Sequence, residues 1–336
     1  MRVLVYGGGA VGLGLSSCLI EAGASVQIVA RPAAVTLLRA AGLRRGGIFG
    51  AFTAPPSAFA CAATLDEILA QPAAPAEPPS QGVALADPFD FILICVKSFD
   101  TVAAARDLAR HPALRAAPTS LVLCQNGWGN REAFLDECPG APLYSARVIT
   151  GFSRPRANEV EITVHADAMH LGALGSEPLV ALEPLCAALI RGGLPCAVTP
   201  HIERDLWAKM LCNCSLNPLG ALFDVPYGAL AGSVPTRAIM NAVHEEIFRV
   251  LRAAGLRTHW PDAAAYQADF YARLVPATAA HCSSTLQDIR AGKRTEIEAL
   301  SGAIVALARR HALPVPVNET LYQMVKYLEA RATGQT

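Results

Sequence analysis

Short apolar runs that alternate with helix-length segments dominate the first 200 residues of the chain. Residues 2–6, 25–30 and 89–97 are mostly apolar, which is typical of parallel strands covered on both faces. Residues 10–22 and the segment that begins at Arg31-Pro32 have helical character, because the first ends at a glycine and the second opens with a proline. Strands that alternate with helices predict βαβ units and a parallel sheet.

The same half of the chain holds weaker signals for the sheet and its edges. The segment LRRGGIFGAF, residues 43–52, predicts a hairpin or a bulged edge. Residues 71–82 are rich in Pro, Ala and Gln and predict a surface loop without chemistry. Residues 119–127 predict another strongly buried strand, like residues 89–97. Further strand-like segments, which we expect to extend the sheet, lie at 143–150, 160–165 and 168–172.

From about residue 200 the pattern changes to long helical segments. We predict helices at 203–217, 236–254, 262–289, 296–311 and 319–331. There is no internal repeat. The pattern therefore predicts an α/β chain with two domains, a Rossmann-type parallel-sheet domain over residues 1–199 and an all-helical domain over residues 200–336.

The composition supports a large folded core. The chain has 336 residues, of which 52% are hydrophobic and only 17% are charged, and this excludes a wholly disordered protein. Lys and Arg together number 28 and match the 28 Asp and Glu, so the charge balance gives no indication of a nucleic-acid partner. No apolar run approaches the roughly 18 residues of a membrane span, and we expect no membrane association.

The ten cysteines are expected to be inert thiols in a reducing compartment. Five of them lie in apolar runs, namely Cys18, Cys95, Cys124, Cys186 and Cys212. The sequence has neither a CxxC pair nor a Cys/His spacing that would predict a zinc site. Residues 1–24 have the outline of a signal peptide, but glycines interrupt the apolar stretch and Glu21 follows it. We therefore predict a cytoplasmic protein without a metal site.

A glycine-rich turn follows the first predicted strand and opens the first predicted helix. This is the context in which G-x-G-x-x-G binds a dinucleotide, although the alternative of a plain glycine turn remains. The first glycine allows the tight turn, the second admits the pyrophosphate and the third lets helix and strand pack closely. The predicted cofactor-binding residues of this turn are Gly7, Gly8, Gly9, Ala10, Val11 and Gly12.

The residue that distinguishes NAD from NADP follows the second predicted strand. NAD-binding domains carry an acid there, about 20 residues after the glycines, to bind the ribose 2′-hydroxyl. This chain has no acid at that place and has Arg31 instead. An arginine can pair with a 2′-phosphate, so we predict NADP(H). The alternative is a surface arginine that begins a helix.

Two later strand ends also carry polar residues, and ligands bind at the carboxyl ends of parallel strands. Lys97 ends one strand and offers a cation, while Asn126 ends the next and offers both a donor and an acceptor. We predict that both bind the cofactor. A helix-start lysine and a plain Asn-Gly turn are the alternatives. Besides Lys97 and Lys209, the chain has only two lysines, Lys293 and Lys326, for which solvent exposure is the simple explanation.

A polar stripe runs along one predicted helix of the second half. Lys209, Asn213 and Asn217 are spaced by four residues and therefore share one helical face. The rest of this helix is apolar, so we expect it to be buried. Burial would lower the pKa of the lysine toward the pH at which a general acid works. The alternative is a half-exposed polar stripe.

A second polar segment runs from Ser283 to Glu298. One helix is expected to end near Gly292 and another to begin near Thr295, where Thr295 and Glu298 fit a capping box. Glu296 lies in the first turn of that predicted helix, where the dipole favours any carboxylate. Spacing alone therefore leaves both a structural and a catalytic role open for Glu296.

Together these motifs resemble the ketopantoate reductase (2-dehydropantoate 2-reductase) family over essentially the whole chain. The segment at residues 71–82 looks like an insertion relative to that family. The resemblance rests on GGGAVG with Arg31, VKSFD, QNGWGN, LWAKMLCNCSLNPLGAL, SSTLQDIRAGKRTEIEALSG and LPVPVNETLYQMVK.

The resemblance implies a fold, a reaction and a set of site residues. It implies a helical domain like that of 6-phosphogluconate dehydrogenases, with the site between the two domains, and NADPH-dependent reduction of ketopantoate to pantoate, a pantothenate precursor. It assigns catalytic-site roles to Lys209, as general acid, and to Glu296. A homodimer is compatible with such a chain. The residues that the resemblance places at the substrate are Asn126, Asn213, Asn217, Ser284 and Glu296.

The chain departs from the family pattern at two positions. Tyr227 and His281 stand where the family leads us to expect asparagines. Both side chains are bulkier and would reshape the substrate pocket, so a reductase of another branched or hydroxylated 2-oxo acid is the alternative. A non-catalytic NADPH-binding sensor is a further alternative, against which the buried lysine argues.

Overall fold

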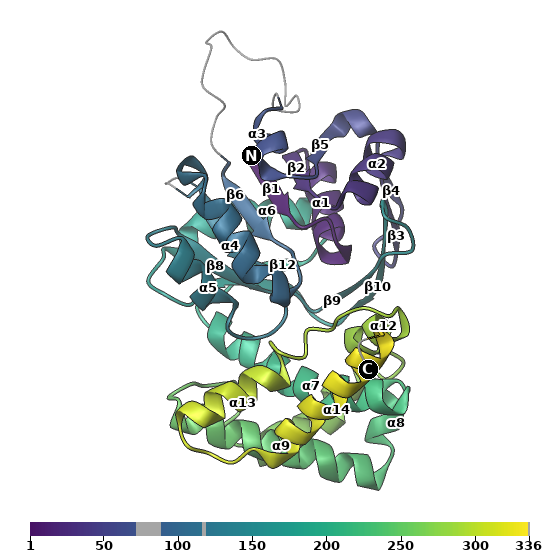
Figure 1. Ribbon diagram of the computed structural model, residues 1–336, viewed down its shortest axis with the longest axis vertical. Coiled ribbons are helices and arrows are strands. Elements are labelled where there is room, and N and C mark those ends of the chain that lie inside the picture. The colour runs from purple at the N-terminus through teal and green to yellow at the C-terminus, as the bar shows by residue number, and fades with distance from the viewer. Residues whose placement is uncertain (72–88, 116–118, 335–336) are drawn as a thin grey trace. The chain divides into compact units, whose positions relative to one another are not determined.

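The computed structural model describes residues 1–71, 89–115 and 119–334 (Figure 1). Most of the loop expected at 71–82 lies outside these residues. The chain forms two compact units. The first comprises Met1–Gln125 with Asn130–Ile202, and the second comprises Asn126–Gly129 with Glu203–Thr336.

An eight-stranded sheet forms the centre of the first unit, with strand order β12-β11-β8-β7-β6-β1-β2-β5. All neighbouring strands are parallel except β8 and β11, which are antiparallel. The Rossmann-type α/β fold class is thereby confirmed. The strands are β1 (Arg2–Tyr6), β2 (Ser25–Val29), β5 (Phe59–Ala62), β6 (Phe91–Ile94), β7 (Ser120–Leu123), β8 (Leu143–Arg147), β11 (Met169–Ala173) and β12 (Cys196–Val198).

A separate four-stranded sheet corrects one prediction. Residues 160–165 do not extend the central sheet, because β10 (Glu159–His165) pairs with β9 (Thr150–Ser153) and with β3 (Leu43–Gly47) instead. The hairpin expected within residues 43–52 is present, since β3 pairs antiparallel with β4 (Phe52–Ala54). Alternate residues of β10 are buried, which fits a sheet that packs on one side only.

Helices cover the central sheet of the first unit (Figure 1). Apolar side chains of the strands and helices form two buried clusters, one around Leu13, Leu15 and Ile28 and the other around Leu4, Ile92 and Leu121. The helices are α1 (Ala10–Glu21), α2 (Pro32–Ala41), α3 (Leu65–Leu69), α4 (Thr101–Ala109), α5 (Asn130–Glu137) and α6 (Glu183–Arg191).

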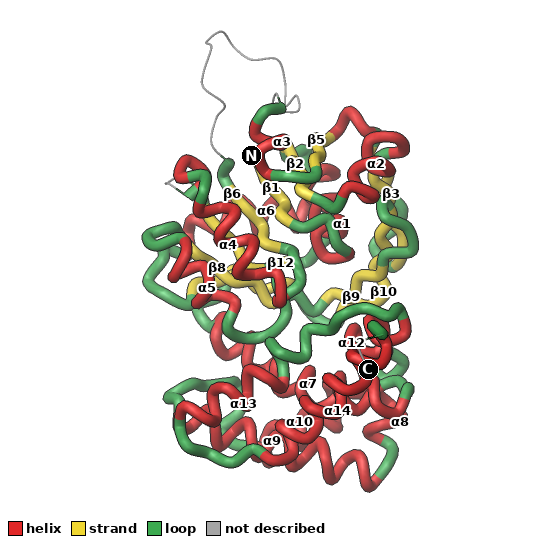
Figure 2. The backbone as a smooth tube through the Cα atoms, in the orientation of Figure 1, coloured by secondary structure: helices red, strands yellow, loops and turns green. Residues whose placement is uncertain are grey.

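The described residues of the second unit form helices and loops without strands (Figure 2). The predicted helix at 262–289 is wrong as one element, because a π-helical turn at Phe270–Leu274 and a non-helical segment before Ser284 interrupt it. The helices are α7 (Ile202–Phe223), α8 (Tyr227–Ala231), α9 (Val234–Ala253), α10 (Ala263–Asp269), α11 (Val275–Ala277), α12 (Ser284–Arg290), α13 (Ser301–Arg310) and α14 (Pro316–Ala332).

The core of the second unit is aromatic and aliphatic. Trp207, Tyr266 and Phe270 are fully buried and belong to the same cluster. Among the described residues, no helix is long and apolar enough to cross a membrane.

Candidate active site

The glycine loop between β1 and α1 makes a turn that only glycine allows at two positions. Gly7 has φ +118°, and a Cβ there would lie 2.6 Å from the amide nitrogen of Val96. A Cβ on Gly12 would lie 2.0 Å from the carbonyl oxygen of Gly7, so helix and loop are too close for any side chain. The amides of Gly7 and Gly8 donate to the carbonyl oxygen of Val29 at 3.0 Å each, which ties the loop to β2.

The outer side of this loop is open. A Cβ on Gly9 would meet no atom within 4 Å. Gly9 is also the N-cap residue of α1, where no side chain caps the helix and no acid lies in the first turn. The first helical amides, at Ala10 and Val11, therefore carry the positive end of the helix dipole without a side-chain acceptor. A diphosphate fits this space and these donors, so the loop suits the predicted dinucleotide.

Both predicted cofactor cations lie at the same edge of the sheet as the glycine loop. Arg31 follows β2 and is the exposed N-cap residue of α2, while the half-buried Lys97 follows β6. Because β2 and β6 flank β1 and run parallel to it, their carboxyl ends lie beside the glycine loop. Asn126, by contrast, belongs to the second unit.

Three polar residues from distant parts of the sequence meet in the second unit. The ammonium of Lys209 donates to the amide oxygen of Asn126, and the amide nitrogen of Asn126 donates to Oε2 of Glu296 at 3.3 Å. One amide thus bridges a cation and a carboxylate, with its acceptor and its donor both used. Glu296 is only 6% exposed and Lys209 is half-buried, so water screens this chain of contacts weakly.

The segment that carries Asn126 is held from two sides. Gly127 has φ +89°, and a Cβ there would lie 2.5 Å from the carbonyl oxygen of Ala299. The next residue, Trp128, donates its amide to that same carbonyl oxygen at 2.8 Å. Its ring packs against the fully buried Trp207 of α7, with ring centroids 4.5 Å apart. These contacts place Asn126 between the helix of Lys209 and the loop of Glu296.

The polar stripe of α7 separates into an accessible and a buried part. Lys209 and Asn213 are half-buried, whereas Asn217 is 3% exposed. The amide oxygen of Asn217 accepts a hydrogen bond from the phenol of Tyr227 at 2.7 Å. The ring of Tyr227 packs edge-on against His281, with centroids 5.2 Å apart. The two departures from the family pattern therefore contact each other, and Tyr227 also binds Asn217.

Ser284 begins α12, three residues after His281. Its neighbour Ser283 caps the helix by accepting from the amide of Leu286 at 3.0 Å, and it also donates to the carbonyl oxygen of Asn217. Ser283 is fully buried and Ser284 is half-buried. Ser284 is therefore the member of the pair that a ligand can reach.

The loop that carries Glu296 differs from the prediction. The predicted capping box and the helix start at 296 are wrong, because α13 begins only at Ser301 and Glu298 turns its carboxylate to the ammonium of Lys326. The hydroxyl of Thr295 accepts from the amide of Ile297 within the loop. Residues 296–300 form turns, in which the carbonyl oxygen of Glu296 accepts from the amides three and four residues later.

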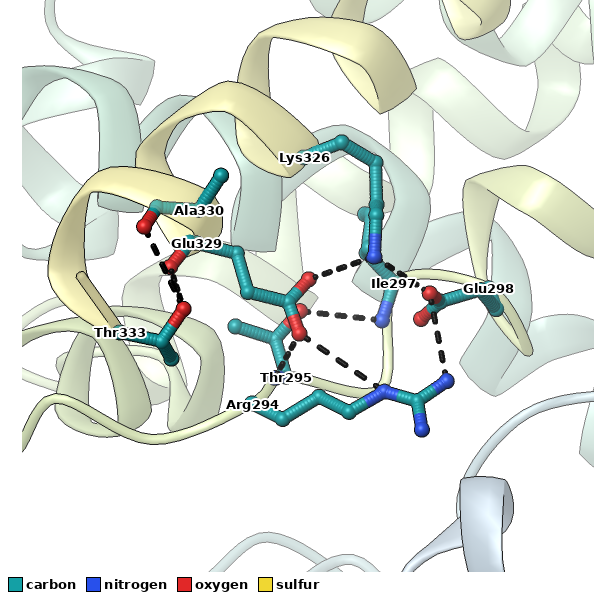
Figure 3. Close-up of polar contacts among 8 residues, drawn as sticks. All are labelled: Arg294, Thr295, Ile297, Glu298, Lys326, Glu329, Ala330 and Thr333. Atoms are coloured by element: carbon teal, nitrogen blue, oxygen red, sulfur yellow. Dashed lines mark hydrogen bonds and ion pairs between the residues drawn. The ribbon is translucent and has the colours of Figure 1, made fainter. Parts of the chain in front are cut away.

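Hydrogen bonds and ion pairs between α14 and this loop hold the loop in place (Figure 3). The amide of Thr295 donates to Glu329 at 3.1 Å, and Lys326 donates to Glu298 at 2.6 Å and to Glu329 at 3.0 Å. Glu329 is only 5% exposed, so its charge needs these donors. The interpretation of Lys326 as simply solvent-exposed is therefore wrong. Its spacing of three residues from Glu329 on one helix was the available signal.

Charge and burial act in opposite directions on this network. Burial alone would raise the pKa of Glu298, but the hydrogen bond from Lys326 lowers it below its ordinary value. Burial alone would lower the pKa of Lys326, but its bonds to Glu298 and Glu329 raise it. In both cases the ion pair outweighs desolvation and keeps both groups charged.

Thiols and metal ligands add nothing to this site. All ten cysteines are free, and burial raises the pKa of most of them, among them Cys212 to about 12. Within the ranges that the structure describes, no group of three His, Cys, Asp or Glu residues could hold a metal ion.

Comparison with known proteins covers both units. Residues 3–176 match the family model described as ketopantoate reductase PanE/ApbA, and residues 201–329 match the model of the C-terminal part of the same family. The chain is 33% identical over 330 residues to the 2-dehydropantoate 2-reductase of Aquifex aeolicus, which covers 98% of this chain and 97% of the relative.

Solved structures agree at the level of the fold. The PanE/ApbA family ketopantoate reductase of Ralstonia eutropha is 28% identical, with a TM-score of 0.80 over 99% of both chains. A D-mandelate dehydrogenase, solved with NADH and anilino(oxo)acetate, has a TM-score of 0.81 over 99% of both chains at 18% identity. That second likeness concerns the fold alone.

Proposed function

Because the chain belongs to the ketopantoate reductase family, we propose that it reduces the 2-oxo group of 2-dehydropantoate to a hydroxyl with NADPH, which yields pantoate. The observation that carries the proposal is the hydrogen-bonded series Lys209–Asn126–Glu296. It offers an ammonium proton donor of fixed direction in a site where water screens charge weakly, as carbonyl reduction requires.

NADPH, when bound, would supply the hydride and with it both electrons of the reduction. Lys209 stabilises the negative charge that develops on the carbonyl oxygen and donates the proton that completes the hydroxyl. Solvent then returns a proton to Lys209. Lysine suits this role because its amine can lose a proton, which arginine does not do in proteins.

Asn126 and Glu296 orient the proton donor. Asn126 accepts from Lys209 through its oxygen, which fixes the direction of the ammonium group. Glu296 accepts a hydrogen bond from the amide nitrogen of Asn126, so the amide group of Asn126 cannot rotate freely. We assign Ser284, Asn213 and Glu296 to the polar groups of the substrate.

The geometry of the first unit supports the following cofactor residues. Gly7, Gly9 and Gly12 shape the loop, the amides of Ala10 and Val11 face the diphosphate, and Arg31 takes the 2′-phosphate. Lys97 adds a cation at the same sheet edge. The free thiols support a reducing, cytoplasmic compartment. A homodimer is proposed as the assembly, and light scattering after gel filtration measures it.

One contact favours a second candidate, a reductase of another 2-oxo acid. Tyr227 donates a hydrogen bond to the amide oxygen of Asn217 and packs beside His281. These contacts change the shape of the substrate pocket.

Steady-state kinetics with a panel of 2-oxo acids distinguish the two candidates. The panel contains ketopantoate, its analogue without the hydroxyl (2-oxoisovalerate) and an aromatic 2-oxo acid, each with NADPH. We expect the highest kcat/KM for ketopantoate. The lowest value for ketopantoate on this panel would refute the proposal, and a highest value for the aromatic acid would establish the second candidate.

A further inference from the structure

Arg154 reaches the glycine loop from the second sheet of the first unit. It directly follows β9, and its Nη1 donates to the carbonyl oxygen of Gly8 at 3.0 Å. The strand is held against α1, because a Cβ on Gly14 would lie 2.3 Å from the ring of Phe152. The guanidinium of Arg154 is therefore placed at the loop by a packed strand and by a hydrogen bond.

Gly8 also contacts the residue that precedes Arg31. A Cβ on Gly8 would lie 2.5 Å from the Cβ of Ala30, so the backbone of Gly8 packs directly on the end of β2. Arg31 follows at the next position. The two arginines, 123 positions apart in the sequence, thus approach the same glycine from different strands.

The two guanidinium groups repel each other electrostatically. Burial lowers the pKa of Arg154, and the charge of Arg31 lowers it further. Within residues 1–71, 89–115 and 119–334, neither arginine forms an ion pair with a carboxylate, whereas Arg156, two residues further along, pairs with Glu159 at 3.6 Å. Two positive charges that lie close together without a paired carboxylate favour the binding of an anion.

We propose that Arg154 binds the 2′-phosphate of NADPH together with Arg31, and is a second residue that selects NADPH over NADH. A phosphate monoester carries nearly two negative charges at neutral pH, which two guanidinium groups can neutralise. Each guanidinium presents a planar fork that matches phosphate oxygens. Arg154 can keep Nη1 on Gly8 while its remaining N–H groups face the phosphate. The inference rests on the proposed use of NADPH.

Calorimetric titration of the full chain tests this directly, without turnover. The ligands are NADPH, NADH and 2′,5′-ADP, and the variants are Arg154→Ala, Arg31→Ala and, as the matched control, Arg156→Ala. For Arg154→Ala we expect affinity for NADPH and 2′,5′-ADP to fall about 10- to 100-fold. Affinity for NADH should change less than about twofold, and Arg156→Ala should leave all three affinities unchanged.

The double variant adds an independent readout. If both arginines share one phosphate, their effects on NADPH binding should be non-additive, while their effects on NADH should simply add. Equal losses for NADPH and NADH in Arg154→Ala would overturn the inference and assign the arginine to the diphosphate or to loop structure. Unchanged NADPH affinity would also overturn it. Failure of the proposed substrate would appear only in the kinetics with 2-oxo acids, and these titrations would stand.

Discussion

The glycine loop of the first unit and the lysine site of the second unit are built from different chemistry. The loop uses backbone amides and absent side chains, and its essential glycines lie within six consecutive residues, Gly7–Gly12. The lysine site uses three side chains whose positions differ by 83 and 170 residues. One site depends on what the chain leaves out, and the other on what three separate segments bring together.

This difference decides how each site should respond to substitution. In the loop, an added methyl group is harmful through the space it takes. In the lysine site, a removed group is harmful through the proton or the hydrogen bond that is lost. The following changes test whether the two sites separate in this way.

The largest effect is expected for Lys209→Ala. Removal of the proton donor should lower kcat about 10²- to 10⁴-fold, which is the usual contribution of general acid catalysis. The Kd for NADPH should change less than about twofold, because the loop lies in the other unit. Stopped-flow or steady-state kinetics measure the first quantity and calorimetry the second.

Two lysine-specific controls accompany this variant. Lys209→Arg keeps the charge but should not restore turnover, since a guanidinium does not give up its proton. Lys293→Ala, at an exposed loop position, should behave like the unmodified chain. If Lys209→Ala kept its turnover, Lys209 would lose its assignment as the general acid.

A pair of glycine variants tests the loop. In Gly12→Ala the new methyl would lie 2.0 Å from the carbonyl oxygen of Gly7. Helix propensity alone predicts stabilisation by about 0.5–1 kcal/mol, whereas this overlap predicts destabilisation by about 1–3 kcal/mol. The sign of the change in Tm without ligand therefore decides between the two.

Gly9→Ala should show the opposite behaviour. Its methyl meets no protein atom within 4 Å, so Tm should stay the same while NADPH affinity falls at least about tenfold, since the methyl stands where the diphosphate approaches. An unchanged affinity would mean that the diphosphate does not use this side of the loop.

A smaller effect is expected from the network behind Glu296. Glu329→Gln removes the charge that Lys326 and the amide of Thr295 share. The loop should then hold Glu296 less firmly, so KM for the 2-oxo acid should rise several-fold with a smaller fall in kcat. A fall in kcat alone would place this network in the chemical step rather than in positioning.

The same network predicts a pH dependence of stability. The pKa of Glu298 is lowered in the folded state, so its contribution is present above the unfolded pKa and is lost as the pH falls through the folded value. The pKa of Lys326 is raised, so its contribution is lost as the pH rises through the folded value. Lys326→Met should therefore flatten the profile of Tm at both ends between about pH 3 and 11. Lys293→Met should leave the profile unchanged.

Sequence reasoning found the contiguous features more readily than the distant ones. The glycine loop, the apolar strands and the place of Arg31 just after the second strand were predictable because their signals are local. The misassigned segment at 160–165 carried a local signal as well, since EVEITVH alternates where the central strands are uniformly apolar. That alternation is typical of a strand buried on one face.

The contacts of the α14 network that supports the lysine site could not be predicted from residue spacing. Lys326 contacts Glu298 across 28 positions and Glu329 reaches Thr295 across 34, which no helical periodicity encodes. The same holds for Arg154, which lies 146 residues from Gly8. In the region 262–289 helical propensity was overruled locally, because Ser283 caps a new helix there. Long-range contacts of this kind emerge only from the tertiary fold.

The smallest effect is expected for Tyr227→Phe, and it addresses the substrate rather than the chemistry. Loss of the phenolic hydroxyl leaves the buried amide oxygen of Asn217 without this donor, which should destabilise the fold by about 1–3 kcal/mol. Tyr271→Phe is the matched control, because it removes a similar bond, to Asn241 at 2.8 Å, elsewhere in the second unit. Both variants should lower Tm, but only Tyr227→Phe should change the ratio of kcat/KM between ketopantoate and 2-oxoisovalerate, by a few-fold. An equal ratio in the two variants would mean that Tyr227 is a packing residue, and that the hydroxyl of the substrate is recognised only by groups nearer to Lys209.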